Sequence, residues 1–331
     1  MKLLLVVNGV DAPLLRQFGC DCERCCLAGE RQANTSVSLI GLTEAGETAA
    51  HLLVDAGAGV VDSLVQMPYL RGARARLDWV LLTHWHPDHT ADLNRLCSSY
   101  HLTRVRAGLP APRPRVWCRA GTAAWMETLH AYEWHNFLAP VVAPGGEPPG
   151  TLLPSVDVGL PGVCITPVSV SHYTADRAVA DAGEVRYGCA AFVVETAETK
   201  TVLLWDIDSE NQWLWQPQTA AQETAVARLA EADYLFVDTS FWRAQARRTT
   251  HPSFENVQRI AASLRPRQTL LMHLSGHPDP RGEAAWGWGN GRWSAEASRA
   301  WAAAGLPGGV RVPGIGETFV LAADLKPDRA L

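Results

Sequence analysis

The stretch Thr83-His84-Trp85-His86-Pro87-Asp88-His89 brings together four potential metal ligands, three histidines and one aspartate. It directly follows the apolar run Trp79-Val80-Leu81-Leu82, whose short length and content of valine and leucine predict a buried strand. We therefore expect the four side chains to meet where this strand ends. His84 and His86 suit one metal ion, whereas Asp88 and His89 turn the other way and suit a second. Two metal ions that share a bridging water are typical of hydrolytic enzymes.

Four other apolar runs of the chain also end in a histidine or an aspartate. The residues that follow these runs are, in chain order, Asp55, His172, Asp206 and His273. Each of them alone is more often a turn or capping residue than a ligand, but their order and their repeated position after an apolar run favour one shared metal centre. In these motifs the chain resembles the metallo-β-lactamase superfamily, over residues 1 to about 280.

The resemblance implies an α/β fold, the four-layer αββα metallo-β-lactamase sandwich. It also implies a role for each motif residue. Asp55 is expected to orient the metal loop without binding metal itself. Asp88 is expected to be both a ligand and a catalytic residue. The implied ligands are His84, His86 and His172 for the first metal ion, Asp88, His89 and His273 for the second, and Asp206 as the bridge between them.

Length and charge bound the architecture and the partners. The chain has 331 residues and no linker-like run, which predicts a single domain over residues 1–331. Its formal net charge of −5 argues against binding of a long nucleic acid. The apolar run at residues 1–7 is too short for a signal peptide, and no run is long enough to span a membrane. We therefore expect a cytoplasmic protein without a membrane partner.

A second cluster follows the first predicted strand and reads Cys20-Asp21-Cys22-Glu23-Arg24-Cys25-Cys26. In a cytosolic protein such a cluster favours metal binding over disulfides. The spacing of Cys20, Cys22 and Cys25 places three thiolates around one loop, as a tetrahedral structural zinc requires. The fourth ligand has two candidates: His277, four residues after His273, and Cys26, which competes although adjacent cysteines rarely chelate one ion.

The combination of both clusters resembles the phosphodiesterase of the carbon–phosphorus lyase pathway, which hydrolyses phosphoribosyl cyclic phosphate. In that subgroup a Cys-x-Cys-x-x-Cys loop and a late histidine hold a structural zinc, and the late histidine comes three residues after the last catalytic ligand. A similar cysteine loop also marks the pyrroloquinoline-quinone biosynthesis protein B, an iron-dependent hydroxylase, although residues 31–36 match its following segment only loosely.

An acid for a leaving group is predicted between Asp206 and His273. Residues 232–238 predict a strand that ends in Asp238, and His251 lies just before a predicted helix. This spacing resembles the tRNA 3′-processing ribonuclease branch, in which an acidic residue and a histidine protonate the leaving oxygen or steady the phosphate. The simpler interpretation is that His251 caps the helix. At most one of the nearby arginines is expected to touch a phosphate: Arg243, Arg247 or Arg248.

The remaining segments are predicted more coarsely. Periodic apolar residues predict helices at residues 92–100, 122–134, 218–232 and 253–264. Residues 101–165 are longer than the fold requires and contain several tryptophans, which suits either a substrate lid or the surface of a homodimer. The Trp- and Gly-rich segment at about 282–301 shows no usable periodicity and is predicted to be irregular.

These patterns predict a dinuclear metal-dependent hydrolase, a phosphoric diester hydrolase that acts on a small cyclic or nucleotide-like phosphodiester. The predicted cofactors are two divalent ions, zinc or manganese with iron as the alternative, and one structural zinc. The alternative function is a mononuclear iron-dependent hydroxylase of the pyrroloquinoline-quinone biosynthesis protein B type. The full set of seven ligands favours the hydrolase, because mononuclear iron oxygenases need fewer protein ligands.

Overall fold

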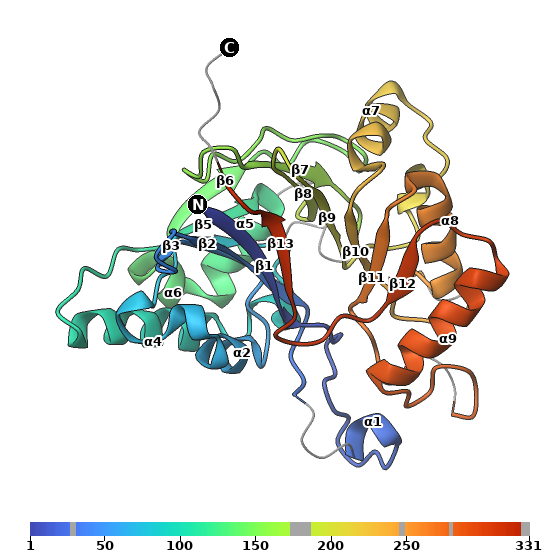
Figure 1. Cartoon of the computed structure of the whole chain (residues 1–331), viewed down its shortest axis with the longest axis horizontal. Coiled ribbons are helices and arrows are strands. Elements are labelled where there is room, and N and C mark those ends of the chain that lie inside the picture. The colour runs from blue at the N-terminus through green and yellow to red at the C-terminus, as the bar shows by residue number, and fades with distance from the viewer. Residues whose placement is uncertain (27–30, 173–186, 245–248, 278–280, 326–331) are drawn as a thin grey trace.

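The computed structural model describes residues 1–26, 31–172, 187–244, 249–277 and 281–325. Its strands form two sheets, which lie side by side in Figure 1. The first sheet has the order β13-β1-β2-β3-β4-β5-β6 and the second the order β12-β11-β10-β9-β8-β7. The strands are β1 Lys2–Gly9, β2 Ser36–Leu42, β3 Thr48–Val54, β4 Trp79–Leu81, β5 Arg115–Arg119, β6 Ala139–Ala143, β7 Cys164–Ser169, β8 Ala190–Glu195, β9 Lys200–Leu204, β10 Tyr234–Asp238, β11 Gln268–Met272, β12 Gly309–Arg311 and β13 Thr318–Ala322.

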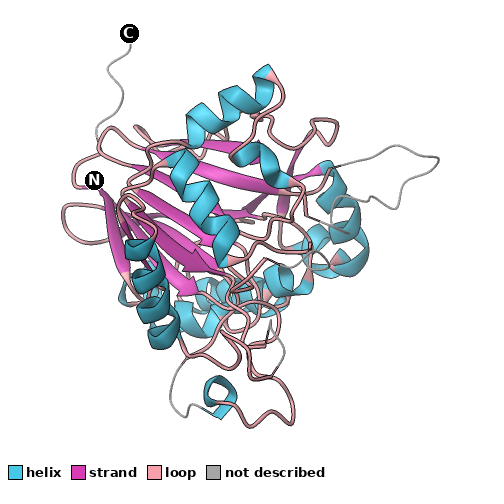
Figure 2. Ribbon diagram, turned by 90° about the vertical axis from the view of Figure 1, so that its right-hand side faces the viewer, coloured by secondary structure: helices cyan, strands magenta, loops and turns pink. Residues whose placement is uncertain are grey.

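Helices cover the outer faces of both sheets. α2, α4 and α6 lie along the first sheet, and α7, α8 and α9 lie beside the second, whereas α1 lies apart from both sheets at the bottom of Figure 1 (Figures 1 and 2). The α-helices are α1 Glu23–Cys26, α2 Val60–Gln66, α3 Pro87–Thr90, α4 Leu93–Arg106, α5 Ala120–Leu129, α6 Ala131–Asn136, α7 Ala220–Leu229, α8 Phe254–Leu264 and α9 Asn290–Ala303. This arrangement confirms the predicted αββα sandwich.

The alternation of side chains along the strands explains the layers. In β1, Leu3, Leu5 and Val7 belong to the core between the sheets, whereas Leu4 and Val6 belong to the core under the first layer of helices. A strand whose two faces are both buried needs apolar residues at every position, because successive side chains point to opposite faces. The first strand is therefore a continuous apolar run.

The ends of parallel strands bring the predicted site residues to one place. β3 and β4 pair in parallel, as do β9, β10 and β11. Just beyond their last residues, or at the last residue of β10, lie Asp55, His84, Asp206, Asp238 and His273. Asp55, Asp206 and His273 have φ values of 61°, 56° and 54°. This left-handed backbone is uncommon for residues other than glycine and recurs at functional sites.

The predicted helices are found with shifted ends. Residues 122–134 form two helices, α5 and α6, instead of one, and the chain changes direction between them at His130. Helix α8 begins with a capping box, in which the Ser253 hydroxyl accepts the backbone N–H of Asn256. Within the described ranges, no helix is long and apolar enough to cross a membrane.

Two segments differ from their predicted character. The segment 101–165 contains β5, α5, α6 and β6, so it extends the first sheet by two strands, and its use as a lid or dimer surface stays a prediction. The prediction that residues 282–301 are irregular is wrong for its second half, which forms α9. Trp293, Ala297 and Trp301 are the buried residues of this helix, at a spacing of four.

Candidate metal centre

The first group of ligand atoms comes from three loops that follow strands. His84 and His86 lie in the loop after β4, His172 follows β7, and Asp206 follows β9. One ligand atom from each of these four residues lies within 4.8 Å of the others. His172 Nε2 is 3.1 Å from Asp206 Oδ1, and His84 Nε2 is 3.3 Å from Asp206 Oδ2. These are the four residues predicted to contact the first metal ion.

The second group contains Asp88, His89 and His273 together with the same Asp206, again within 4.8 Å. His273 Nε2 is 3.2 Å from Asp88 Oδ2 and 3.4 Å from Asp206 Oδ2. His89 Nε2 lies 2.5 Å from Asp206 Oδ2. The structure therefore brings all seven predicted ligands together, and Asp206 is the residue common to both groups, as a bridging ligand must be.

The outward-facing nitrogens of the histidines are held by polar partners. Asp55 Oδ2 lies 2.8 Å from His89 Nδ1, and Asp55 also accepts hydrogen bonds from the backbone N–H and hydroxyl of Thr83, each at 2.8 Å. Ser240 Oγ lies 3.2 Å from His273 Nδ1. Such contacts fix the ring orientation and leave Nε2 for a metal. Asp55 thus contacts the metal loop as predicted.

Two supporting residues of this kind were not predicted. The indole N–H of Trp205 donates to Asp55 Oδ2 at 2.9 Å, and the Ser240 hydroxyl donates to Asp238 Oδ1 at 3.2 Å. Both lie next to or near predicted residues in the sequence, but Trp205 reaches Asp55 only because the two sheets pack together, whereas Ser240 and Asp238 are two residues apart.

The centre contains buried polar atoms that metal ions would satisfy. His84 Nε2 and Asp206 Oδ1 are buried and have no hydrogen-bond partner in the described part of the chain. Such atoms are costly to bury unless something compensates them. Imidazole nitrogens and carboxylate oxygens are ligands for zinc, iron and manganese. The residues present therefore fit a pair of divalent metal ions.

Burial and charge split the histidines into two sets. Burial is the main cause that holds the pKa of His84 well below its usual range and lowers the pKa of His172 to about 3. Burial acts in the same direction at His273, but Asp206 and Asp238 outweigh it and raise the pKa of His273 to about 9. Burial opposes the charge of Asp206, yet the imidazoles around it, His172 first, hold its pKa well below the usual range. The Asp206 carboxylate is thus in the metal-binding form.

His251 and Asp238 form the predicted pair beside this centre. His251 Nδ1 is 3.0 Å from Asp238 Oδ2 and 3.2 Å from Asp206 Oδ1. The His251 side chain is 18% exposed, whereas Asp238 is fully buried. Burial lowers the pKa of His251, but Asp238 outweighs it and raises the pKa. Ser253, not His251, is the N-cap of α8, so the capping interpretation of His251 is wrong.

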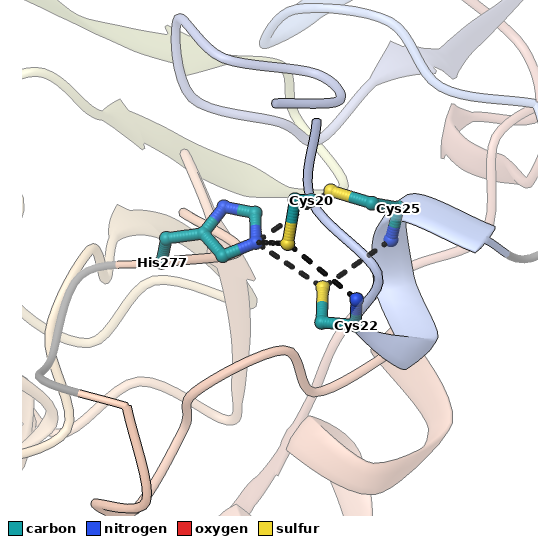
Figure 3. Close-up of side chains that lie close together, drawn as sticks. All are labelled: Cys20, Cys22, Cys25 and His277. Atoms are coloured by element: carbon teal, nitrogen blue, oxygen red, sulfur yellow. Dashed lines mark hydrogen bonds between the residues drawn. The ribbon is translucent and has the colours of Figure 1, made fainter. Parts of the chain in front are cut away.

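The cysteine cluster is assembled from both ends of the chain. His277 Nε2 lies 3.0 Å from Cys20 Sγ, 3.1 Å from Cys22 Sγ and 3.5 Å from Cys25 Sγ. Figure 3 shows the imidazole of His277 pointing at the thiols of Cys20 and Cys22. Cys26 is exposed, and its thiol lies 3.9 Å from the backbone oxygen of Cys20. The geometry therefore favours His277 over Cys26 as the fourth ligand.

The loop that carries these thiols is anchored by a buried ion pair. Arg24 and Asp11 are both 2% exposed and in contact, and Arg24 Nη1 also donates to the backbone oxygen of Trp288 at 3.2 Å. A Cβ on Gly287, which has φ +65°, would lie 2.8 Å from Cys22 Cβ, so only glycine fits there. The segment after His277 and the cysteine loop thus pack against each other.

The remaining candidates near the centre are less informative. Arg243 is exposed, and Arg247 and Arg248 lie outside the described residues. Trp85 stacks on Trp125 with ring centroids 4.3 Å apart, which agrees with a packing role for Trp85.

The profile described as "Beta-lactamase superfamily domain" matches residues 50–274, about two thirds of the chain. The chain belongs to the metallo-β-lactamase superfamily. The matched residues include Asp55 and every predicted catalytic ligand. Membership in this superfamily and the two groups of ligand atoms support a metal-dependent hydrolase.

Solved structures of low sequence identity share the fold. The metallo-β-lactamase fold protein YhfI from Bacillus subtilis is 16% identical with a TM-score of 0.63, over 97% of this chain and all of the other. A diphosphatase of the PhnP family is 19% identical with a TM-score of 0.61, over 97% of each chain. Zn²⁺-bound PqqB from Methylobacterium extorquens is 18% identical with a TM-score of 0.64, over 96% of this chain and 99% of the other. A search of curated proteins gave no match.

Proposed function

We propose that the protein is a two-metal phosphodiesterase that cleaves a small cyclic or nucleotide-like phosphodiester. The observation that carries this proposal is the position of Asp206. Its carboxylate is shared by both groups of metal ligands and is also 3.2 Å from His251, whose side chain is 18% exposed. A pair of ions and a proton donor around one point are what hydrolysis of a phosphodiester with a poor leaving group requires.

Each side chain then has a defined task. Two divalent ions, when bound, supply an activated water as nucleophile and neutralise charge on the phosphoryl oxygens. Asp206 holds the two positions together. Asp238 accepts from His251 Nδ1 at 3.0 Å and so leaves Nε2 as the nitrogen that donates a proton to the departing oxygen. Asp55 and Ser240 keep the rings of His89 and His273 in place.

We assign a structural zinc to Cys20, Cys22, Cys25 and His277. In a tetrahedral site with zinc–sulfur and zinc–nitrogen distances of about 2.3 and 2.0 Å, sulfur and nitrogen ligands lie about 3.5 Å apart. The three distances from His277 Nε2 to the thiols, 3.0 to 3.5 Å, are close to this value. Four protein ligands close such a site, so its contribution is to folding and not to catalysis.

The proposal is tested by metal analysis together with substrate profiling. The purified protein is expected to contain two ions of the catalytic type and one further zinc, and to cleave bis(p-nitrophenyl) phosphate and 2′,3′-cyclic nucleotides faster than p-nitrophenyl acetate or a β-lactam. Asp206→Ala serves as the inactive control. A chain that holds one iron and consumes oxygen with a reductant, and does not cleave phosphodiesters, would instead be a hydroxylase.

A further inference from the structure

The loop that follows Asp206 is hydrogen-bonded to the loop that carries His172. Asn211 opens the short 3-10 helix η5, Asn211–Leu214, and its side chain is 1% exposed. Its Oδ1 accepts the backbone N–H of Ser171 at 2.9 Å, and its Nδ2 donates to the backbone oxygen of Ser171 at 2.8 Å. A side-chain amide that bonds both backbone groups of one residue acts like a neighbouring strand. Ser171 is the residue directly before His172.

The Asn211 amide is itself fixed on both sides. Its Oδ1 also accepts the indole N–H of Trp213 at 3.2 Å, and its Nδ2 also donates to the backbone oxygen of Asp208 at 3.0 Å. Asp208 adds two contacts to the same loop, because its backbone N–H donates to Ser171 O at 3.0 Å and its Oδ2 accepts the Ser171 hydroxyl at 2.9 Å. These hydrogen bonds therefore fix the orientation of the buried Asn211 amide.

The same loop also reaches the segment of His251. The backbone N–H of Ser209 donates to the backbone oxygen of Thr249 at 2.9 Å, and that of Ile207 donates to Asp238 Oδ2 at 3.3 Å. Residues 206–211 thus fasten two other parts of the centre to Asp206. Asn211 and Asp208 both bond to Ser171, and Asn211 is the one whose side chain binds both the backbone N–H and the backbone oxygen of that residue.

We propose that Asn211 is a positioning residue for the first metal position. It sets the distance between His172 and Asp206, which are 3.1 Å apart at their ligand atoms. The second metal position uses Asp88, His89 and His273 instead of His172. Loss of the Asn211 amide should therefore lower metal affinity at the first position and leave the affinity of the second position unchanged. The proposal rests on the metal centre proposed above but not on the identity of the ester that it cleaves.

The test is the variant Asn211→Asp, studied by metal binding to the full chain. The aspartate keeps the shape and the acceptor for Ser171 N–H, but it replaces a donor with an oxygen that faces two backbone oxygens. Substitution of a residue that holds a metal ligand in place typically lowers metal affinity by about 10- to 100-fold. We expect a loss of this size for one of the two ions in a competitive Zn²⁺ titration. Anomalous diffraction from Zn²⁺-soaked crystals should then show reduced occupancy beside His172 alone.

A matched control and a milder variant complete the design. Gln212→Ala removes a neighbouring exposed amide in the same 3-10 helix and should leave both affinities unchanged. Trp213→Phe removes the indole N–H that holds the Asn211 oxygen, and it carries the test if Asn211→Asp does not fold. Its expected effect is about 3- to 10-fold at the same position, the size of one neutral hydrogen bond.

Two results would overturn the proposal. Wild-type zinc affinity at both metal positions would show that the hydrogen bonds from Asn211 to Ser171 do not set the geometry of His172. Equal losses at both positions, together with a lowered melting temperature, would show a general structural role. The measured quantity is metal affinity, which does not depend on the substrate. A failure to cleave phosphodiesters would therefore contradict the proposed function without deciding whether Asn211 positions His172.

Discussion

Removal of the His251 imidazole should slow hydrolysis in proportion to how much the leaving group needs a proton. His251 Nδ1 is committed to Asp238 at 3.0 Å, and the side chain remains 18% exposed, so its other nitrogen is the one available to a substrate. General acid catalysis typically contributes about 10²–10⁴-fold. At about 1.36 kcal/mol per decade, this is roughly 3–5 kcal/mol of transition-state stabilisation. His251→Ala should therefore lose that factor for esters with alkoxide leaving groups.

The assay compares two substrates on one variant. An alkyl phosphodiester such as a 2′,3′-cyclic nucleotide needs protonation of its leaving oxygen, whereas a nitrophenyl ester does not, so the second should lose less than about tenfold. Metal content measured on the same samples separates the acid role from a damaged centre. His135→Ala, which removes an exposed histidine of α6, is the matched control.

Two outcomes decide against this assignment. Equal losses on both substrates would mean that His251 only positions the phosphate. Full activity on both would remove the proton donor from the mechanism, and with it the main reason to prefer a phosphodiesterase over other hydrolases of the same fold.

Three further predictions address other parts of the molecule. Cys22→Ser should lower the melting temperature by at least about 5 °C and release zinc with little change in turnover, whereas Cys26→Ser should do neither; an unchanged melting temperature would exclude the zinc. Gly57→Ala places a Cβ 1.8 Å from a backbone oxygen of the metal loop and should abolish metal binding, while Gly291→Ala, with open space around it, should bind normally in the same titration. Burial lowers the pKa of His51 from 6.5 to about 4. The free energy of unfolding should therefore be constant above about pH 6.5 and fall by about 3 kcal/mol as the pH drops toward 4, because protonation of the buried imidazole is unfavourable. An NMR titration that gives a pKa near 6.5 would contradict this.

The grouping of the candidate metal ligands could be predicted because each is encoded locally. A short apolar run followed by histidine or aspartate determines both the strand and the residue at its end, and parallel neighbours carry these ends to one edge. The cysteine loop is local in the same sense, and His277 was one of two candidates for its fourth ligand because it lies four residues after His273. These parts of the site depend little on details of packing between distant segments.

The supporting contacts could not be predicted because they join residues far apart in sequence. Trp205 reaches Asp55 across 150 residues, and Asn211 reaches Ser171 across 40. Nothing in the local pattern distinguishes these side chains from ordinary core residues. Helix α9 was missed for another reason. Its stripe of Trp293, Ala297 and Trp301 begins only after the Gly-rich turn at residues 282–289, so a window that spans both shows no period.

The structure also contains a third group of ligand atoms, in which the proposed function places a proton donor and not a third ion. Asp206, Asp238, His251 and His273 lie within 4.8 Å of one another. His273 Nε2, however, already belongs to the second group, where it is 3.2 Å from Asp88 Oδ2. The other, Nδ1, lies 3.2 Å from the Ser240 hydroxyl. His251 faces Asp238 with Nδ1, so an ion placed there would have to displace the hydrogen bond that holds the ring. The proposed arrangement of two ions beside one protonated imidazole leaves this hydrogen bond intact, and the leaving-group comparison on His251→Ala tests it.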